Sequence, residues 1–170
     1  MCSSDLYFVD DAGDQVIENP GGGTDAIFST VSRILEPNVE TLVLQGTGDL
    51  FGDGNLFANK LYGNSGNNVL NGEDGNDLIN GGAGRDRLIG GAGNDTFAFA
   101  AGQADGDIVV DFDDGGLFGT ADTLKFIGYG AGATLSRNDA THWQVDGGGF
   151  HEVITFQNAP SIQSFDVLFV

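Results

Sequence analysis

A nine-residue period between Gly63 and Ala98 constrains the fold of this chain more than any other feature of the sequence. Four consecutive units read GNSGNNVLN, GEDGNDLIN, GGAGRDRLI and GGAGNDTFA. Glycine occupies the first and fourth places of every unit, Asp or Asn the sixth, and an apolar residue the eighth. Each unit therefore joins a glycine-rich, acidic loop to a short apolar strand, and glycine lets such a loop turn tightly. The period predicts a repeat architecture of stacked turns.

The apolar and the acidic places of each unit make separate predictions. The eighth-place residues Leu70, Ile79, Leu88 and Phe97 are expected to point inward and to form a ladder between stacked turns. The sixth-place carboxylates and the glycine carbonyls are hard oxygen ligands, which suit calcium and not a soft metal. An Asn at the sixth place, such as Asn68, offers an oxygen without a charge. Such a turn should bind calcium weakly or serve structure alone.

The composition is strongly acidic, with 25 Asp and Glu residues against 6 Lys and Arg and a formal charge of −19. A chain of this charge repels nucleic acid and anionic membrane surfaces. No apolar run approaches the roughly 20 residues of a transmembrane helix, so membrane insertion is not expected. One interpretation is a solvated acidic surface. The loop spacing favours another, in which divalent cations neutralise the aspartates and make folding possible.

The four units resemble the calcium-binding nonapeptide repeats of the RTX, or haemolysin-type, family. The resemblance implies an all-β fold built on a parallel β-roll, a right-handed β-solenoid in which two nonapeptides complete one turn. Alternate repeats would then stack on the same edge, with Ca²⁺ between the stacked loops. The stacking pairs Asp77 with Asp95 on one edge, and Asn68 with Asp86 and then Asp107 on the other. The implied carbonyl ligands are those of Gly72, Gly75, Gly81, Gly84, Gly90 and Gly93.

The segment before the repeats divides into two parts. Residues 1–6, MCSSDL, resemble the translation of a common sequencing adaptor and are expected to be non-native. They hold the only cysteine, so the chain cannot form an internal disulfide. Residues 7–62 are expected to be degenerate solenoid coils, with strands at 27–29, 31–35 and 39–44. They resemble segments that flank repeats in haemolysin-type proteins, which implies an N-terminally truncated fragment.

The segment after the repeats changes its pattern. The calcium-binding roll is expected to span residues 63–113, with an insertion around 100–104 that displaces Asp107 from the regular spacing. Residues 114–170 are expected to form an antiparallel β cap, in which 141–146 pairs with 150–156 as a hairpin. The last residues, SFDVLFV, resemble the C-terminal region of type I secretion substrates, although a terminal edge strand would look similar.

No catalytic constellation is found in the sequence, and this chain is not expected to be an enzyme. His142 and His151 are the only histidines, and neither an HExxH zinc motif nor a GxSxG nucleophile elbow occurs. The resemblance implies a secreted, extracellular calcium-binding module whose partners are calcium ions and the type I secretion machinery. Two alternatives remain for the parent protein. It is either a secreted enzyme, such as a metalloprotease, lipase or alginate epimerase, or an adhesin or surface-layer protein.

Overall fold

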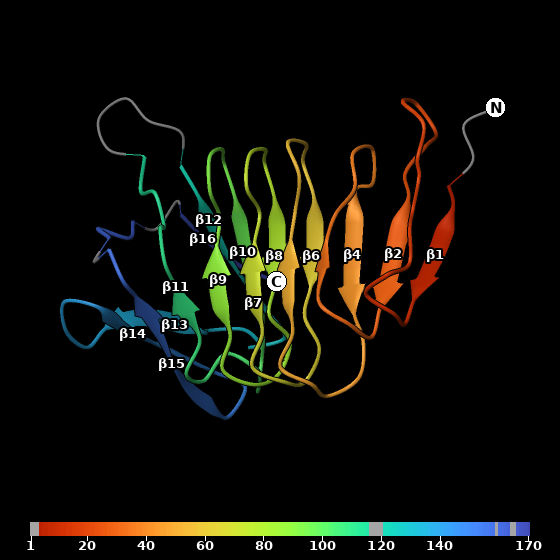
Figure 1. Cartoon of the computed structure of the whole chain (residues 1–170). Coiled ribbons are helices and arrows are strands. Elements are labelled where there is room, and N and C mark those ends of the chain that lie inside the picture. Colours follow the sequence, from red (N-terminus) through yellow and green to blue (C-terminus); the bar gives the residue numbers. More distant parts are fainter. Residues whose placement is uncertain (1–3, 116–120, 159, 164–165) are drawn as a thin grey trace.

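The chain winds as a solenoid between two β-sheets (Figure 1). The computed structural model describes residues 4–115, 121–158, 160–163 and 166–170. In these residues the chain forms strands and turns without a helix, and so none of them belongs to a helix long and apolar enough to cross a membrane. The expected all-β class is confirmed.

The first sheet has eight strands, all joined in parallel. Its order is β1-β2-β4-β6-β8-β10-β12-β16. The strands are β1 (Leu6–Val9), β2 (Ala26–Ser29), β4 (Thr41–Leu44), β6 (Lys60–Tyr62), β8 (Leu78–Asn80), β10 (Thr96–Ala100), β12 (Thr123–Ile127) and β16 (Val167–Phe169). From β3 to β12, consecutive strands alternate between the two sheets, which is the path of a solenoid.

The second sheet is parallel along most of its length and antiparallel at one end. Its parallel strands are β3 (Arg33–Ile34), β5 (Phe51–Asp53), β7 (Val69–Asn71), β9 (Arg87–Ile89) and β11 (Ile108–Val109). They are followed by β15 (Phe150–Phe156), β14 (His142–Gly147) and β13 (Thr134–Arg137), which pair antiparallel with one another. The expected hairpin and the C-terminal antiparallel segment are therefore confirmed.

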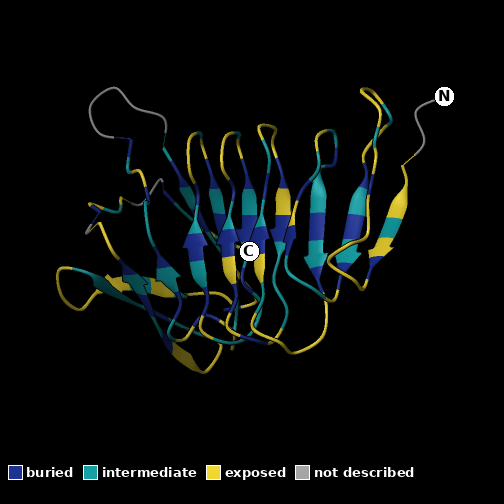
Figure 2. Cartoon of the chain, viewed as in Figure 1, coloured by how far each residue is buried: buried dark blue, intermediate teal, exposed yellow. Residues whose placement is uncertain are grey.

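The strand register stacks the apolar places of the repeats directly above one another. Leu61 pairs with Ile79 and Ile79 with Phe97 in the first sheet, and Leu70 pairs with Leu88 in the second. All five side chains are fully buried between the sheets. Figure 2 shows the same pattern, with buried strand centres and exposed turns. Each such side chain contributes about 1.5–3 kcal/mol by leaving water, so the ladder of inward residues forms the core that holds the turns together.

The C-terminal region closes the core with aromatic side chains. Phe112 packs against Phe97 and edge-on against Phe156, with ring centroids 6.2 and 5.6 Å apart. Strands β12 and β16 continue the first sheet in parallel, so parallel pairing extends past residue 113 into the C-terminal region. The tail residues Val167–Phe169 form the last strand of that sheet, in line with the edge-strand interpretation of the C-terminus. Ser164 and Phe165 lie outside the described residues.

Candidate metal centre

The loops that connect the two sheets lie along two edges of the solenoid. We call the edge whose loops lead into the first sheet the first edge. Its sixth-place residues are joined by a ladder of backbone-to-carboxylate hydrogen bonds. The N–H of Asn59 donates to Asp77 Oδ1 at 2.7 Å, and the N–H of Asp77 donates to Asp95 Oδ1 at 2.9 Å. The N–H of Asp95 continues the ladder to Asp122 Oδ1 at 2.8 Å. The stacking of Asp77 on Asp95 is the one expected from the sequence.

The second edge, whose loops lead into the second sheet, repeats this arrangement with a shorter column. The N–H of Asn68 donates to Asp86 Oδ1 at 2.7 Å, and the N–H of Asp86 donates to Asp107 Oδ1 at 2.9 Å. The last step spans 21 residues instead of 18, because the loop before β11 is longer. The structure therefore brings Asn68, Asp86 and Asp107 together in the expected order.

One oxygen of each repeat aspartate has no protein partner. The Oδ2 atoms of Asp77, Asp86 and Asp95 are buried and accept no hydrogen bond, although the other oxygen of each carboxylate does. Burying an ionised carboxylate oxygen without a partner is strongly unfavourable, so such atoms are rare unless a cation binds them. Asp122 differs, because its Oδ2 accepts the N–H of Asp113 at 2.9 Å. Three of the four aspartates predicted to bind metal, Asp77, Asp86 and Asp95, therefore carry such an oxygen. Among the described residues, so do Asp25, Glu36 and Asp166, which were not predicted.

The first-place glycines keep the space around these oxygens open. A Cβ on Gly72 would lie 2.2 Å from Asp77 Oδ2 and 2.5 Å from the carbonyl oxygen of Gly90. The carboxylate and a carbonyl from the next turn therefore face one small volume that only glycine leaves free. Gly81 and Gly90 hold the same relation to Asp86 Oδ2 and Asp95 Oδ2, at 2.2 and 2.4 Å. Hard oxygens gathered from adjacent turns are the donor set that calcium prefers.

The fourth-place glycines bring successive loops into backbone contact. A Cβ on Gly93 would lie 1.6 Å from the carbonyl oxygen of Gly75, one turn earlier. Gly84 approaches the carbonyl of Gly66 in the same way, at 2.4 Å. All six glycines predicted as carbonyl ligands therefore lie in the stacked loops, although their role as ligands stays a prediction.

The two Asn residues in the ladder are satisfied without a metal. The side-chain oxygen of Asn59 accepts the N–H of Asn55 at 2.7 Å, and that of Asn68 accepts the N–H of Asn64 at 2.8 Å. The amide nitrogen of Asn68 donates to the side chain of Asn64 at 3.1 Å. These turns therefore close on their own hydrogen bonds, in agreement with a structural or weakly binding role.

Burial shifts the titration of the aspartates in the ladders. Desolvation raises the pKa of Asp86 to about 6, of Asp77 to about 7 and of Asp107 to about 8. Backbone hydrogen bonds oppose the rise, and neighbouring carboxylates add to it at Asp77 and Asp107. The pKa of Asp95 is raised for the same main reason. Without a cation the carboxylates resist ionisation, and a bound divalent cation would stabilise their charged form.

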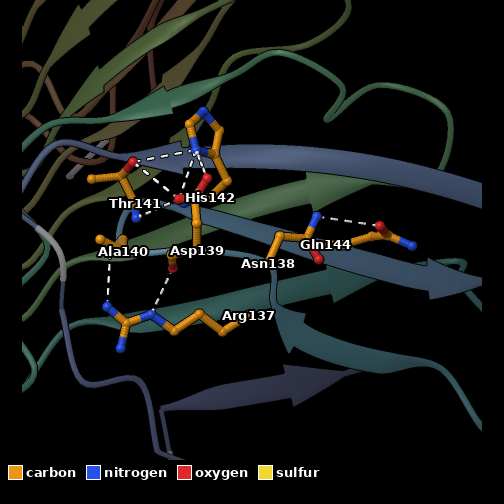
Figure 3. A network of polar contacts seen from close by, with 7 residues as sticks. All are labelled: Arg137, Asn138, Asp139, Ala140, Thr141, His142 and Gln144. Carbon is orange, nitrogen blue, oxygen red and sulfur yellow. Dashed lines mark hydrogen bonds and ion pairs between the residues drawn. The ribbon is translucent and has the colours of Figure 1, made fainter.

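A polar network at the β13–β14 turn does not form a catalytic triad (Figure 3). The Nδ1 atom of His142 lies 2.8 Å from Asp139 Oδ1 and 3.3 Å from Thr141 Oγ1. A Ser–His–Asp arrangement needs the acid and the hydroxyl on opposite ring nitrogens, whereas here both use the same one. Arg137 donates to the carbonyls of Asp139 and Ala140. The network stabilises the turn.

The chain is similar to a known family of repeats and to a solved structure. The profile of the RTX calcium-binding nonapeptide repeat (4 copies) matches residues 53–87 and 62–97. Residues 53–97 are therefore RTX calcium-binding repeats. The chain is similar to the solution structure of the AlgE6R3 subunit from the Azotobacter vinelandii mannuronan C5-epimerase, with 28% identity and a TM-score of 0.57. The likeness covers 79% of this chain and 86% of that chain. A comparison with curated proteins gave no match.

The ladders extend beyond the matched RTX repeats. Asp25 and Asp122 each precede a strand of the first sheet. Each accepts a backbone N–H from the residue at the equivalent place one turn earlier, which is Asp5 for Asp25 and Asp95 for Asp122. Neither residue is among the ligands that the sequence predicts. Both carry the repeat's step of Asp, any residue and a buried apolar residue, with Ile27 and Leu124 at the apolar place. That step was the available signal, but longer loops obscured the period.

Proposed function

We propose that this chain is the calcium-binding RTX module of a secreted bacterial protein, and that it folds when it meets extracellular calcium. The buried, unpaired Oδ2 atoms of Asp77, Asp86 and Asp95 carry the proposal. They give the metal-free fold an unfavourable buried charge that a cation would offset. Asp77 with Asp95 is the first candidate pair and Asp86 with Asp107 the second, with glycine carbonyls completing the oxygen shell.

The expected affinity explains why folding would wait for export. Sites of extracellular calcium modules have dissociation constants of about 10⁻⁴ to 10⁻³ M. Cytosolic calcium is far lower, so the sites would be empty inside the cell. The empty chain combines a formal charge of −19 with 29 glycines, whose ordering costs entropy. An unfolded state in the cytosol suits type I export, and the C-terminal tail is the proposed secretion signal.

Circular dichroism during a calcium titration tests calcium-dependent folding. The full chain should gain β-sheet signal between about 10⁻⁴ and 10⁻² M calcium, the range in which sites of this class fill. Magnesium at the same concentration is the control, because its smaller octahedral shell suits these loops poorly. A β-rich spectrum that persists in excess chelator would reject the proposal. The export signal is tested separately, by comparing secretion of the full chain with that of a chain lacking residues 164–170.

A role as the C-terminal module of a secreted enzyme is the second candidate. The observation that favours it is the likeness to a subunit of a mannuronan C5-epimerase. The chain itself then supplies calcium-dependent folding and export, and the catalytic domain lies elsewhere in the parent protein. Sequencing the parent gene upstream of Tyr7 tests this, because an enzyme domain there would support it and a long repeat array would favour an adhesin.

A further inference from the structure

Three carboxylates meet at the N-terminal end of the solenoid, outside the matched repeats. Asp5 precedes β1, Asp25 precedes β2, and Glu18 lies in the long loop between these strands. One carboxylate oxygen from each residue can be chosen so that all three lie within 4.8 Å of one another. The sequence around them lacks the nonapeptide pattern, and nothing in the repeat register predicts that Glu18 returns to this edge.

Asp25 resembles the repeat aspartates in its burial and in the hydrogen bonding of its carboxylate. Its side chain is fully buried, its Oδ1 accepts the N–H of Asp5 at 2.7 Å, and its Oδ2 is buried without a partner. Asp77, Asp86 and Asp95, which lie in the calcium-binding repeats, show this combination of one paired and one unpaired oxygen. A buried, unpaired carboxylate oxygen on a residue that clusters with two further carboxylates is strongly unfavourable unless a cation binds there.

Glu18 is held in place by neutral donors. The hydroxyl of Tyr7 donates to its Oε2, and the N–H of Asn19 donates to its Oε1 at 3.1 Å. The hydrogen bonds described at Glu18 and Asp25 fix the carboxylates without neutralising them.

We propose that Glu18 and Asp25 hold a calcium ion that ties the first coil of the solenoid to the second, with Asp5 as an additional ligand. The donor set is oxygen alone, without His or Cys, which selects a hard cation. Calcium takes six to eight oxygens in a flexible geometry, which suits carboxylates from separate segments, whereas magnesium demands near-ideal octahedral geometry and usually keeps several waters.

The proposal rests on Glu18 and Asp25 because residues 1–6 are expected to be non-native. The two residues come from different segments, the loop after β1 and the entry to β2. A shared ion therefore cross-links the loop to the first sheet at a point where the repeat itself provides no metal. The N–H of Asp25 also donates to Glu40 Oε2 at 2.8 Å, which connects the ion to the next strand, β4.

Counting bound calcium per chain by equilibrium dialysis tests the site in the full chain. Glu18→Gln should lower the count by one relative to the unsubstituted chain. Asp10→Asn, an exposed carboxylate in the same loop, is the matched control and should leave the count unchanged. An unchanged count in Glu18→Gln would overturn the proposal. So would loss of the ion in Asp5→Asn, because the native pair would then be insufficient. Retention of that ion at weaker affinity supports the proposal.

Terbium luminescence gives a second measurement that does not depend on overall stability. Tb³⁺ replaces calcium in oxygen sites and is sensitised by a nearby phenol, and Tyr7 contacts Glu18 directly. Tyrosine-excited emission should therefore fall in both Tyr7→Phe and Glu18→Gln, whereas the dialysis count falls in Glu18→Gln alone. Asp77→Asn removes a repeat ligand and should leave the Tyr7-dependent part of the emission intact. Emission that does not respond to either Tyr7→Phe or Glu18→Gln would overturn the site.

Discussion

Replacing Asp77 with Asn tests the role of the unpaired oxygen. The protein already shows how an Asn behaves at this place, because the neighbouring turn has one. Asn59 occupies the same ladder position one turn earlier and satisfies its side chain within the protein. In Asp77→Asn, Oδ1 can still accept the N–H of Asn59, and an amide N–H takes the place of Oδ2. The carbonyl of Gly90 faces the same space beside Gly72 as Asp77 Oδ2 does, so an acceptor lies on the side of the new amide N–H.

The substitution should have opposite effects with and without calcium. In chelator it removes a buried, unpaired acceptor and its charge, and this should stabilise the fold by about 1–3 kcal/mol. In about 10 mM calcium, a site with a dissociation constant of about 10⁻⁴ to 10⁻³ M contributes RT ln(1 + [Ca]/Kd), or about 1.4–2.7 kcal/mol. The variant should lose most of that contribution. Calcium would therefore stabilise the variant less than it stabilises the unsubstituted chain.

Urea unfolding followed by circular dichroism measures both effects, with one series in chelator and one in calcium. Both series contain the stabilising osmolyte sucrose, which gives the calcium-free chain a folded population to unfold. Asp74→Asn is the matched control, because Asp74 carries the same charge in the same loop but is exposed. It should leave the calcium-induced gain in unfolding free energy within about 0.5 kcal/mol of its original value. The reasoning is refuted if Asp77→Asn keeps the full calcium-induced gain, or if Asp74→Asn loses as much of it.

Three further predictions follow from the loops and the cap. Gly72→Ala should abolish calcium-induced β structure in circular dichroism because its Cβ would lie 2.2 Å from a carboxylate oxygen, whereas Gly48→Ala, with its nearest contact at 3.9 Å, should fold normally. The pKa values of Asp86 and Asp107 are raised from 3.8 to about 6 and about 8. The folded chain thus binds protons that the unfolded chain releases, and in chelator with the same osmolyte the urea midpoint should fall as pH rises from about 4 to about 8. Excess calcium should remove that trend, and a midpoint in chelator that rises with pH would contradict the assignment. Glu152 accepts two backbone N–H groups and a tyrosine hydroxyl. Glu152→Gln should therefore lower the free energy of unfolding in urea by about 1–3 kcal/mol, because the amide places a donor against a donor. An unchanged midpoint would show that these bonds do not hold the cap.

The sequence determined the architecture of the middle of the chain. Gly, Asp and apolar residues recur at fixed places, and only a solenoid lets Leu70 and Leu88, or Ile79 and Phe97, stack in one ladder. The hairpin of β14 and β15 was also predictable, since alternating residues flank the Gly147–Gly149 turn. The parallel pairing of β12 and β16 with the first sheet was not, because the loops before them break the period.

The tertiary structure decided which carboxylate oxygens remain without partners. The sequence shows an Asp at the sixth place. It does not show that Oδ1 of this Asp accepts a backbone N–H from the preceding turn while Oδ2 accepts none. It also hides the meeting of Glu18 with Asp25, because a loop of irregular length has no register that fixes where its residues return. Periodic residues are positioned by the repeat itself. The others are positioned only when the loops close on the folded sheets.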